Sequence, residues 1–280
     1  MIYIVLMRFK EILKKFPVTI FIYRKLHVNN RIVLLGLLPM RINQIPGIKK
    51  FLADRITFKK LGGIISHTYP ITNDYDNSAG TASGHYFHQD LLVAQFIFEA
   101  NPKTHIDIGS RIDGFVAHVA AFRTIKVFDI RMLPDCGHPN IEFHQEDLML
   151  WDVGNEITDS LSCLHTIEHF GLGRYGDSIN PRGHIIGLEN LVKMLAPNGT
   201  IYISFPIGKT NEVHFNAHRV FHPKDIFSWA PSSLELMRFD FIDDYGQLHK
   251  NFDVLNSNLV INHGCGIYTF KKTSFRKVQV

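Results

Sequence analysis

The stretch HIDIGSRIDGF, residues 105–115, decides the fold. Its first half is a short apolar strand candidate, residues 105–109, which leads through a turn into a helix candidate at residues 114–122. Upstream, residues 88–100 place apolar side chains at helical spacing, and Asn101-Pro102 ends that helix. The sequence therefore predicts a strand between two helices.

Strands and helices continue to alternate downstream. Residues 125–130, 141–147 and 157–165 predict three more strands, residues 183–195 a helix, and residues 200–206 a fifth strand. Such alternation implies right-handed βαβ units, and thus an α/β fold with a doubly wound, mostly parallel sheet. In these sheets ligands bind beyond the carboxyl ends of the strands. We therefore expect the functional residues just after each strand.

Composition excludes several protein classes. Of 280 residues, 45% are hydrophobic and 20% are charged, and the mean hydropathy is +0.00. These values are typical of globular proteins and exclude disordered, collagen-like and coiled-coil chains. The three cysteines, Cys136, Cys163 and Cys265, form no CxxC pair, which favours a reducing compartment.

Charge is distributed unevenly along the chain. Residues 1–60 contain 13 Lys and Arg residues and only two acidic residues, Glu11 and Asp54, which gives a net charge of +11. Residues 61–280 contain 17 Lys and Arg residues and 24 Asp and Glu residues, which gives a net charge of −7. This basic, apolar head predicts either a segment that lies on an anionic membrane surface or an extension packed on the domain. We expect a basic extension over residues 1–84 and a domain over residues 85–280.

The basic head predicts neither a membrane span nor a nucleic-acid interface. Its uncharged stretches Ile2–Met7, Phe16–Tyr23 and Ile32–Met40 all fall short of the about 20 apolar residues that a span needs. No signal-peptide pattern and no nucleic-acid-binding motif is visible. We expect a cytoplasmic protein, peripheral at the inner face of the membrane if the head binds it.

Acidic residues end the first three strands, where a nucleoside needs them. Asp107 and Gly109 end the first strand, and Gly109 allows a tight turn close to a ligand because it has no Cβ. Asp129, twenty residues after Gly109, ends the second strand and can accept both ribose hydroxyls. Asp147 ends the third, where it can accept from an adenine amino group.

This spacing, together with Lys193, Pro197 and Gly199 before the fifth strand, resembles the class I S-adenosylmethionine-dependent methyltransferases over roughly residues 85–245. Four strings resemble more closely the domain of unknown function 268 family: GHYFHQDLLVA, HIDIGSRIDGFVAH, DSLSCLHTIEHFGLGRYGD and VHFNAHRVFHP. The resemblance implies a methyltransferase-like, Rossmann-like domain that binds S-adenosylmethionine, and an association with surface polysaccharides. It names no reaction.

The first turn departs from the methyltransferase pattern Gly-x-Gly-x-Gly. Arg111 and Asp113 stand at its second and third glycines, so Arg111 either pairs with the cofactor carboxylate or blocks the site. No GxGxxG loop opens a helix, which argues against a dehydrogenase and for a cofactor without a pyrophosphate. By the resemblance, the helix that contains Tyr86 lies over the cofactor. The predicted cofactor-binding residues are Asp107, Gly109, Ser110, Arg111, Asp113, Asp129, Asp147 and Tyr86.

Sixteen histidines suggest a metal site or an acid–base site. His165-Thr-Ile-Glu168-His169 matches the H-x-x-E-H pattern of some zinc proteases, but Gly171 follows at once and argues against the long helix that pattern needs. We therefore predict no metal ligands.

A methyltransferase acting on a hydroxyl needs a base, and histidine suits this role at neutral pH. We predict His169, His214 or His218 as that base, with Glu168 orienting it. His214 and His218 are four residues apart, which places them on one face if the segment is helical. The alternative is that all these residues only fix loops by hydrogen bonds.

The sequence thus favours a methyltransferase that acts on a hydroxyl of a sugar or surface-glycan precursor. The glycan part comes from the resemblance alone. The main alternative is a non-catalytic methyltransferase-like module that binds a partner or a nucleotide-sugar, with Arg111 as the sign of lost activity. A metal-dependent hydrolase is the third reading, and the oligomeric state is left open.

Overall fold

The computed structural model describes residues 47–134, 137–150 and 155–273. Residues 1–46, which hold most of the basic head, and Cys136 lie outside the described residues. The chain separates into two compact units, Met1–Thr81 and Ala82–Val280. The described part of the first unit contains helix α3 (Ile48–Lys60). The domain boundary after residue 84 stays a prediction.

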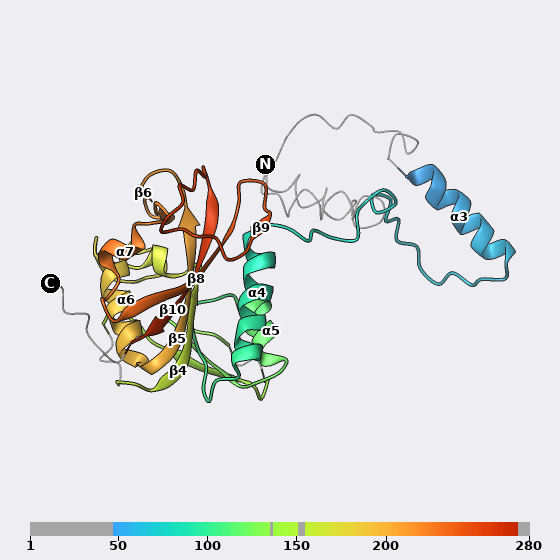
Figure 1. The fold of residues 1–280 in the computed structure, drawn as a ribbon. Coiled ribbons are helices and arrows are strands. Elements are labelled where there is room, and N and C mark those ends of the chain that lie inside the picture. Colours follow the sequence, from blue (N-terminus) through green and yellow to red (C-terminus); the bar gives the residue numbers. More distant parts are fainter. Residues whose placement is uncertain (1–46, 135–136, 151–154, 274–280) are drawn as a thin grey trace, which may run out of the picture. The chain divides into compact units, whose positions relative to one another are not determined.

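The second unit is built on an eight-stranded sheet with the order β3-β2-β1-β4-β5-β10-β8-β9 (Figure 1). The strands from β3 to β5 pair in parallel, whereas β10 is antiparallel to both β5 and β8. The predicted doubly wound, mostly parallel sheet is therefore confirmed. The strands are β1 (Ile106–Ile108), β2 (Ile125–Asp129), β3 (Ile141–Gln145), β4 (Thr158–Leu164), β5 (Leu195–Ile207), β8 (Leu234–Ile242), β9 (Leu248–His249) and β10 (Gly264–Lys272).

Helices cover both faces of this sheet, as Figure 1 shows for α4 and α5 on one side and α6 and α7 on the other. Adjacent residues of β5 therefore enter different cores: Tyr202 packs with α4 and α5, and Ile203 with α6. The helices are α4 (His85–Ala100), α5 (Ala117–Ala120), α6 (Gly183–Met194) and α7 (Ile226–Trp229). No helix in the described part of the chain is long and apolar enough to cross a bilayer.

Two helices differ from their predicted bounds. Helix α4 begins at His85, three residues earlier than predicted, directly after Gly84 in a non-helical conformation. The helix predicted over residues 114–122 is divided into a π-helical turn, η2 (Ile112–Val116), and the short α5. Within η2, Gly114 has a φ of −121° and a ψ of −110°, which are not helical, so regular helical backbone begins after this residue.

Candidate functional site

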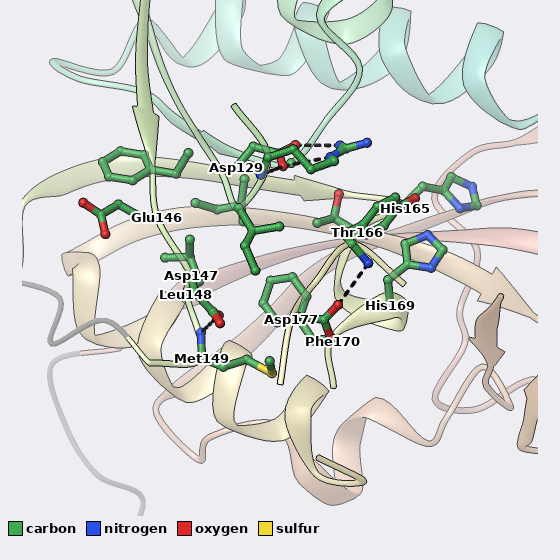
Figure 2. A pocket seen from close by; sticks show the side chains of 16 residues that line it. Asp129, Glu146, Asp147, Leu148, Met149, His165, Thr166, His169, Phe170 and Asp177 are labelled. Atoms are coloured by element: carbon green, nitrogen blue, oxygen red, sulfur yellow. Dashed lines mark hydrogen bonds and ion pairs between the residues drawn. The ribbon is translucent and has the colours of Figure 1, made fainter. Parts of the chain in front are cut away.

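A pocket opens at the carboxyl ends of β1, β2 and β4, the edge of the sheet where ligands bind in this fold class. The empty space inside it, including its opening to solvent, is about 520 Å³. Figure 2 shows the side chains around it. The residues that line it include Gly109, Asp129, Asp147, His165, Thr166 and His169.

Gly109 keeps the backbone of the first turn close to the pocket. Its φ is +68°, and a Cβ built on it would lie 2.5 Å from Cγ2 of Thr166, so a side chain does not fit. Its N–H donates to the carbonyl of Phe128 at 2.8 Å, which ties the turn to the end of β2. The predicted role of Gly109 as a close-approach glycine agrees with this geometry.

Asp107 and Ser110 hold the same turn from within. The fully buried Asp107 carboxylate accepts hydrogen bonds from the Ser110 N–H (3.0 Å), the Ser110 hydroxyl (2.7 Å) and the Ser162 hydroxyl (2.5 Å). Burial raises the pKa of Asp107 to about 6, although these hydrogen bonds act against it. Both side chains shape the turn rather than line the pocket.

Asp129 lies at the pocket wall and is fixed by Arg131. The Arg131 backbone N–H and Nε donate to Oδ1 at 2.8 and 3.0 Å, and a terminal nitrogen donates to Oδ2 at 2.6 Å. The guanidinium also lies 4.3 Å from the centre of the Tyr175 ring. Such a fork fixes the orientation of the carboxylate and leaves acceptor capacity on both oxygens.

Asp147 lies on the opposite wall, beyond β3. Its Oδ1 accepts from the Met149 N–H at 2.9 Å, which closes a local turn (Figure 2). Asp129 and Asp147 thus line one pocket, as the sequence predicted from their positions after β2 and β3.

Arg111, Asp113 and Tyr86 form a separate, exposed cluster. Arg111 donates to both Asp113 oxygens at 3.1 and 3.0 Å, and its guanidinium lies 5.3 Å from the centre of the Tyr86 ring. None of the three lines the pocket. In this arrangement Asp113 holds the Arg111 side chain outside the pocket, so it does not block it.

The HTIEH segment is not a zinc-protease helix. His165 follows β4 with a φ of +49°, and a single 3-10 turn, η3 (Ile167–His169), comes next. The buried Arg219 fastens this turn by donating to the backbone carbonyls of Glu168 (3.2 Å), Phe170 (2.6 Å) and Pro181 (3.3 Å). The two histidines therefore do not stack one helical turn apart.

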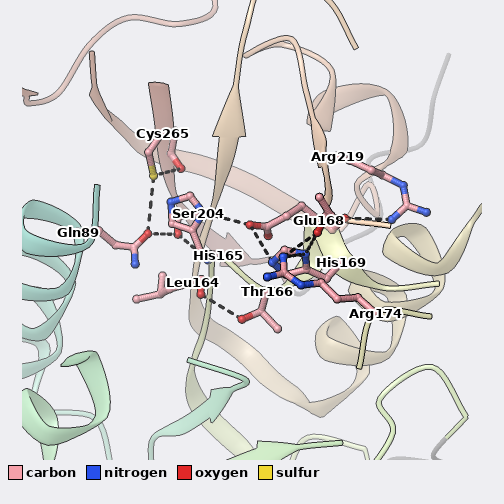
Figure 3. A network of polar contacts seen from close by, with 12 residues as sticks. Gln89, Leu164, His165, Thr166, Glu168, His169, Arg174, Ser204, Arg219 and Cys265 are labelled. Carbon is pink, nitrogen blue, oxygen red and sulfur yellow. Dashed lines mark hydrogen bonds and ion pairs between the residues drawn. The ribbon is translucent and has the colours of Figure 1, made fainter. Parts of the chain in front are cut away.

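Glu168 is a buried carboxylate between two histidines (Figure 3). Its Oε1 lies 3.0 Å from Nδ1 of His165 and 3.7 Å from Nε2 of His169, and its side chain is 1% exposed. Its Oε2 is buried without a hydrogen-bond partner in the described residues. Burial lowers the pKa of His165, but the Cys265 sulfur and the Glu168 carboxylate outweigh it and hold that pKa well above its usual value.

His169 reaches the pocket with a defined tautomer. Its Nδ1 lies 2.7 Å from the Ala217 carbonyl, which can only accept, so Nδ1 carries the proton and Nε2 the lone pair. Burial lowers the pKa of His169, although the Glu168 carboxylate acts in the other direction. The imidazole is therefore neutral at neutral pH and able to accept a proton.

His214 and His218 lie on a hairpin, not on a helix. They face each other across β6 (Glu212–His214) and β7 (His218–Val220), with ring centroids 5.1 Å apart. His214 is half exposed and bonded to Glu212 at 2.7 Å, and the His218 ring lies 6.4 Å from that of His169. Neither lines the pocket. Of the three predicted bases, the structure brings only His169 there.

Several residues at the site were missed by the sequence reasoning. Arg131 and Tyr175 line the pocket but belong to no familiar motif. His85 and Cys265 meet His165 from α4 and β10, and nothing in the local sequence links them. The abundance of histidine was the only available signal. Burial, together with His165 and His263, lowers the pKa of His85 to about 4.

Two comparisons with protein sequences were informative to different degrees. The family model "Caenorhabditis protein of unknown function, DUF268" matches residues 146–260, which confirms the resemblance to that family over this stretch. A comparison with curated proteins finds no match.

Solved structures with a similar fold are remote in sequence. The N-methyltransferase NodS from Bradyrhizobium japonicum, in complex with S-adenosyl-L-homocysteine, is 12% identical, covers 68% of this chain and 88% of its own, and has a TM-score of 0.46. 1,6-Didemethyltoxoflavin-N1-methyltransferase from Burkholderia thailandensis is 13% identical, covers 80% of this chain and 90% of its own, and has a TM-score of 0.47. The [4+2]-cyclase SpnF is 13% identical, covers 81% of this chain and 94% of its own, and has a TM-score of 0.48. Since similar folds host different reactions, the activity has to be argued from the site.

Proposed function

We propose that this chain is an S-adenosylmethionine-dependent methyltransferase whose cofactor occupies the pocket at the carboxyl ends of β1, β2 and β4. The observation that carries the proposal is the joint placement of Gly109, Asp129 and Asp147 around one pocket. The turn at Gly109 has no side chain and can lie close to the amino-acid tail of a nucleoside cofactor. The carboxylates that follow β2 and β3 can accept hydrogen bonds from its nucleoside part. Two structures with a similar fold hold bound S-adenosylhomocysteine, which agrees with this choice.

Each wall of the pocket has a role in this proposal. The ribose hydroxyls donate to Asp129, which Arg131 holds in place. Asp147 would accept from the adenine amino group, and the turn at Gly109 would leave room for the methionine part. When bound, the cofactor supplies an electrophilic methyl group on a sulfonium.

His169 is the proposed base for an acceptor hydroxyl. Attack of an acceptor oxygen on that methyl group would form an oxygen–carbon bond and break the carbon–sulfur bond, whose electron pair would stay on sulfur as a neutral thioether. The hydroxyl proton passes to Nε2 of His169, the nitrogen that the Ala217 bond leaves unprotonated. Glu168, 3.7 Å from that nitrogen, stabilises the resulting imidazolium. Positioning of the two reactants supplies much of the remaining acceleration.

The acceptor in this proposal is a small molecule or a glycan precursor with a free hydroxyl. The sugar assignment rests on the resemblance to the domain of unknown function 268 family. Attachment of residues 1–60 to an anionic membrane also stays a prediction. It is contradicted if a folded variant without these residues still sediments with anionic vesicles.

Cofactor binding is the direct test of the proposed function. In isothermal titration, S-adenosylmethionine and S-adenosylhomocysteine should bind with micromolar or tighter affinity and raise the melting temperature. Asp129→Ala should weaken binding at least about tenfold, since it removes a charged hydrogen-bond acceptor. Glu142→Ala, which removes an exposed carboxylate outside the pocket on β3, serves as the matched control. A folded protein that gives neither heat nor a shift supports the non-catalytic module instead.

A further inference from the structure

Three side chains that are distant in the sequence meet beside the pocket. His85 begins α4, His165 follows β4, and Cys265 lies at the start of β10. One ring nitrogen of each histidine and the Cys265 sulfur all lie within 4.8 Å of one another. The two imidazole rings stack, with centroids 5.5 Å apart and planes 8° from parallel. Within the described ranges, no other three His, Cys, Asp or Glu side chains are spaced in this way.

His165 directs an unsatisfied nitrogen into this group. Its side chain is 8% exposed, and its Nε2 is buried with no hydrogen-bond partner in the part of the chain that the structure describes. Its Nδ1 lies 3.0 Å from the Glu168 carboxylate, so the ring stands between Glu168 and Cys265 (Figure 3). Metal-binding histidines commonly have this arrangement, with one nitrogen on the metal and the other bonded to a carboxylate.

We propose that His85, His165 and Cys265 bind a zinc ion, with Glu168 orienting His165. Imidazole nitrogen and thiolate sulfur are ligands that zinc prefers, and three protein ligands leave its fourth position open, as in catalytic zinc sites. Bonds of about 2.0–2.3 Å place the ligand atoms of a tetrahedral site roughly 3.3–3.6 Å apart. The three side chains therefore close by about 1 Å when the ion binds, and the incoming ion displaces their protons.

A zinc ion at this site would activate the methyl acceptor. His165 lines the pocket and also belongs to the zinc group, so the ion lies next to the proposed cofactor site. A zinc ion lowers the pKa of an oxygen or sulfur bound at its open position, which prepares that atom to attack a methyl group. The acceptor is therefore a hydroxyl or thiol compound that can reach the ion. This role rests on the proposed function, whereas zinc binding itself does not.

The test uses the full chain, freed of metal by a chelator and then dialysed. Calorimetric titration should show one zinc ion per chain, and cobalt(II) should give the near-ultraviolet charge-transfer absorption of a thiolate ligand. Cys265→Ser should abolish that absorption and weaken zinc binding by more than the about 10–100-fold that loss of an outer partner costs. Cys163→Ala, which alters another fully buried cysteine in the other core, should change neither.

A second variant guards against misfolding of Cys265→Ser. His85 is only partly buried, so His85→Ala should fold and still lose at least about tenfold in zinc affinity. Folded wild-type protein that binds no zinc, or a cobalt absorption that persists in folded Cys265→Ser, overturns the proposal. Titration of the same preparation with S-adenosylhomocysteine separates the two proposals. Cofactor binding without zinc contradicts only the zinc site, and zinc without cofactor contradicts only the methyltransferase.

Discussion

Gly109 shows how a single residue keeps the pocket open. Its φ of +68° is unfavourable for any residue with a Cβ, and the space a Cβ would need is occupied by Thr166. Backbone strain and steric conflict thus act at the same position. Thr166 itself lines the pocket, so a shift that relieved the conflict would deform the wall.

We expect Gly109→Ala to lower the free energy of unfolding by about 2–5 kcal/mol, because left-handed backbone costs about 1–2 kcal/mol and overpacking about 1–3 kcal/mol. Gly176→Ala is the matched control, since Gly176 also has a positive φ but no atom within 4 Å of its Cβ position. Chemical denaturation measures both. Equal losses in the two variants would show that the contact with Thr166 is unimportant.

His169 governs the predicted pH dependence of turnover. The neutral ring is the active form, so the rate should rise as pH increases through the pKa of His169 and then level off. Burial lowers the pKa of His169 from its usual value of 6.5, so the midpoint of this rise lies below pH 6.5. His169→Ala should lower kcat by roughly 10²–10⁴-fold, and its rate should no longer rise with pH in this range. His214→Ala, outside the pocket, should lose neither, and a full rate in His169→Ala would remove His169 from this role.

At the scale of elements, Arg219 joins β7 to the η3 turn. Its three backbone acceptors lie at Glu168, Phe170 and Pro181, and its own side chain is buried. The turn that carries Glu168 and His169 is thus held by one cation from a different element.

Arg219→Leu should therefore destabilise the fold by about 3–5 kcal/mol, because buried carbonyls lose a charged donor. The expected loss should exceed that of Arg182→Leu, which alters an exposed arginine nearby. Unfolding monitored by circular dichroism compares the two. Similar stabilities would mean that the turn holds without Arg219.

The sequence predicted strands β1 to β5 and helices α4 and α6, whose apolar patterns reflect burial against the sheet or its helices. Their bounds agree to within two residues except that α4 starts three residues and β5 five residues earlier than predicted. The helix predicted over residues 114–122 departs from helical backbone at Gly114, its first residue, and ends at Ala120, and the sequence left open whether His214 and His218 share a helix. His214 and His218 are paired with each other across the β6–β7 hairpin. A spacing of four residues places two side chains together in a short hairpin as well as on one face of a helix, so spacing alone did not decide between the two.

At the scale of the whole molecule, the site depends on contacts that no local pattern encodes. Asp129 and Asp147 were predictable because both follow strands of a parallel sheet. His85 and Cys265 reach His165 only because α4 packs beside the sheet and β10 inserts between β5 and β8. Arg131 and Tyr175 were equally invisible, since their pairing arises from the folded path of two loops.

Acid sensitivity of the whole fold should reveal its buried histidine. Burial lowers the pKa of His105 to about 3, and its nitrogens lie 2.8 and 3.1 Å from the Ser160 and Ser162 hydroxyls. The unfolded chain takes up a proton near pH 6.5 and the folded chain does not. Stability should therefore fall as pH drops below 6.5, by about 1.4 kcal/mol per unit for this residue. His105→Gln should flatten that slope in denaturation at pH 7 and 5, and an unchanged slope contradicts the assignment.

The most direct measurement of the central claim is a crystal structure of the full chain grown with S-adenosylhomocysteine. We expect the nucleoside to lie between Asp129 and Asp147, with its ribose hydroxyls on Asp129 and its tail along the turn at Gly109. We also expect the sulfur to lie on the side of the pocket where His165 and His169 lie. Density for the ligand elsewhere, or a pocket left empty at saturating ligand, would contradict the account.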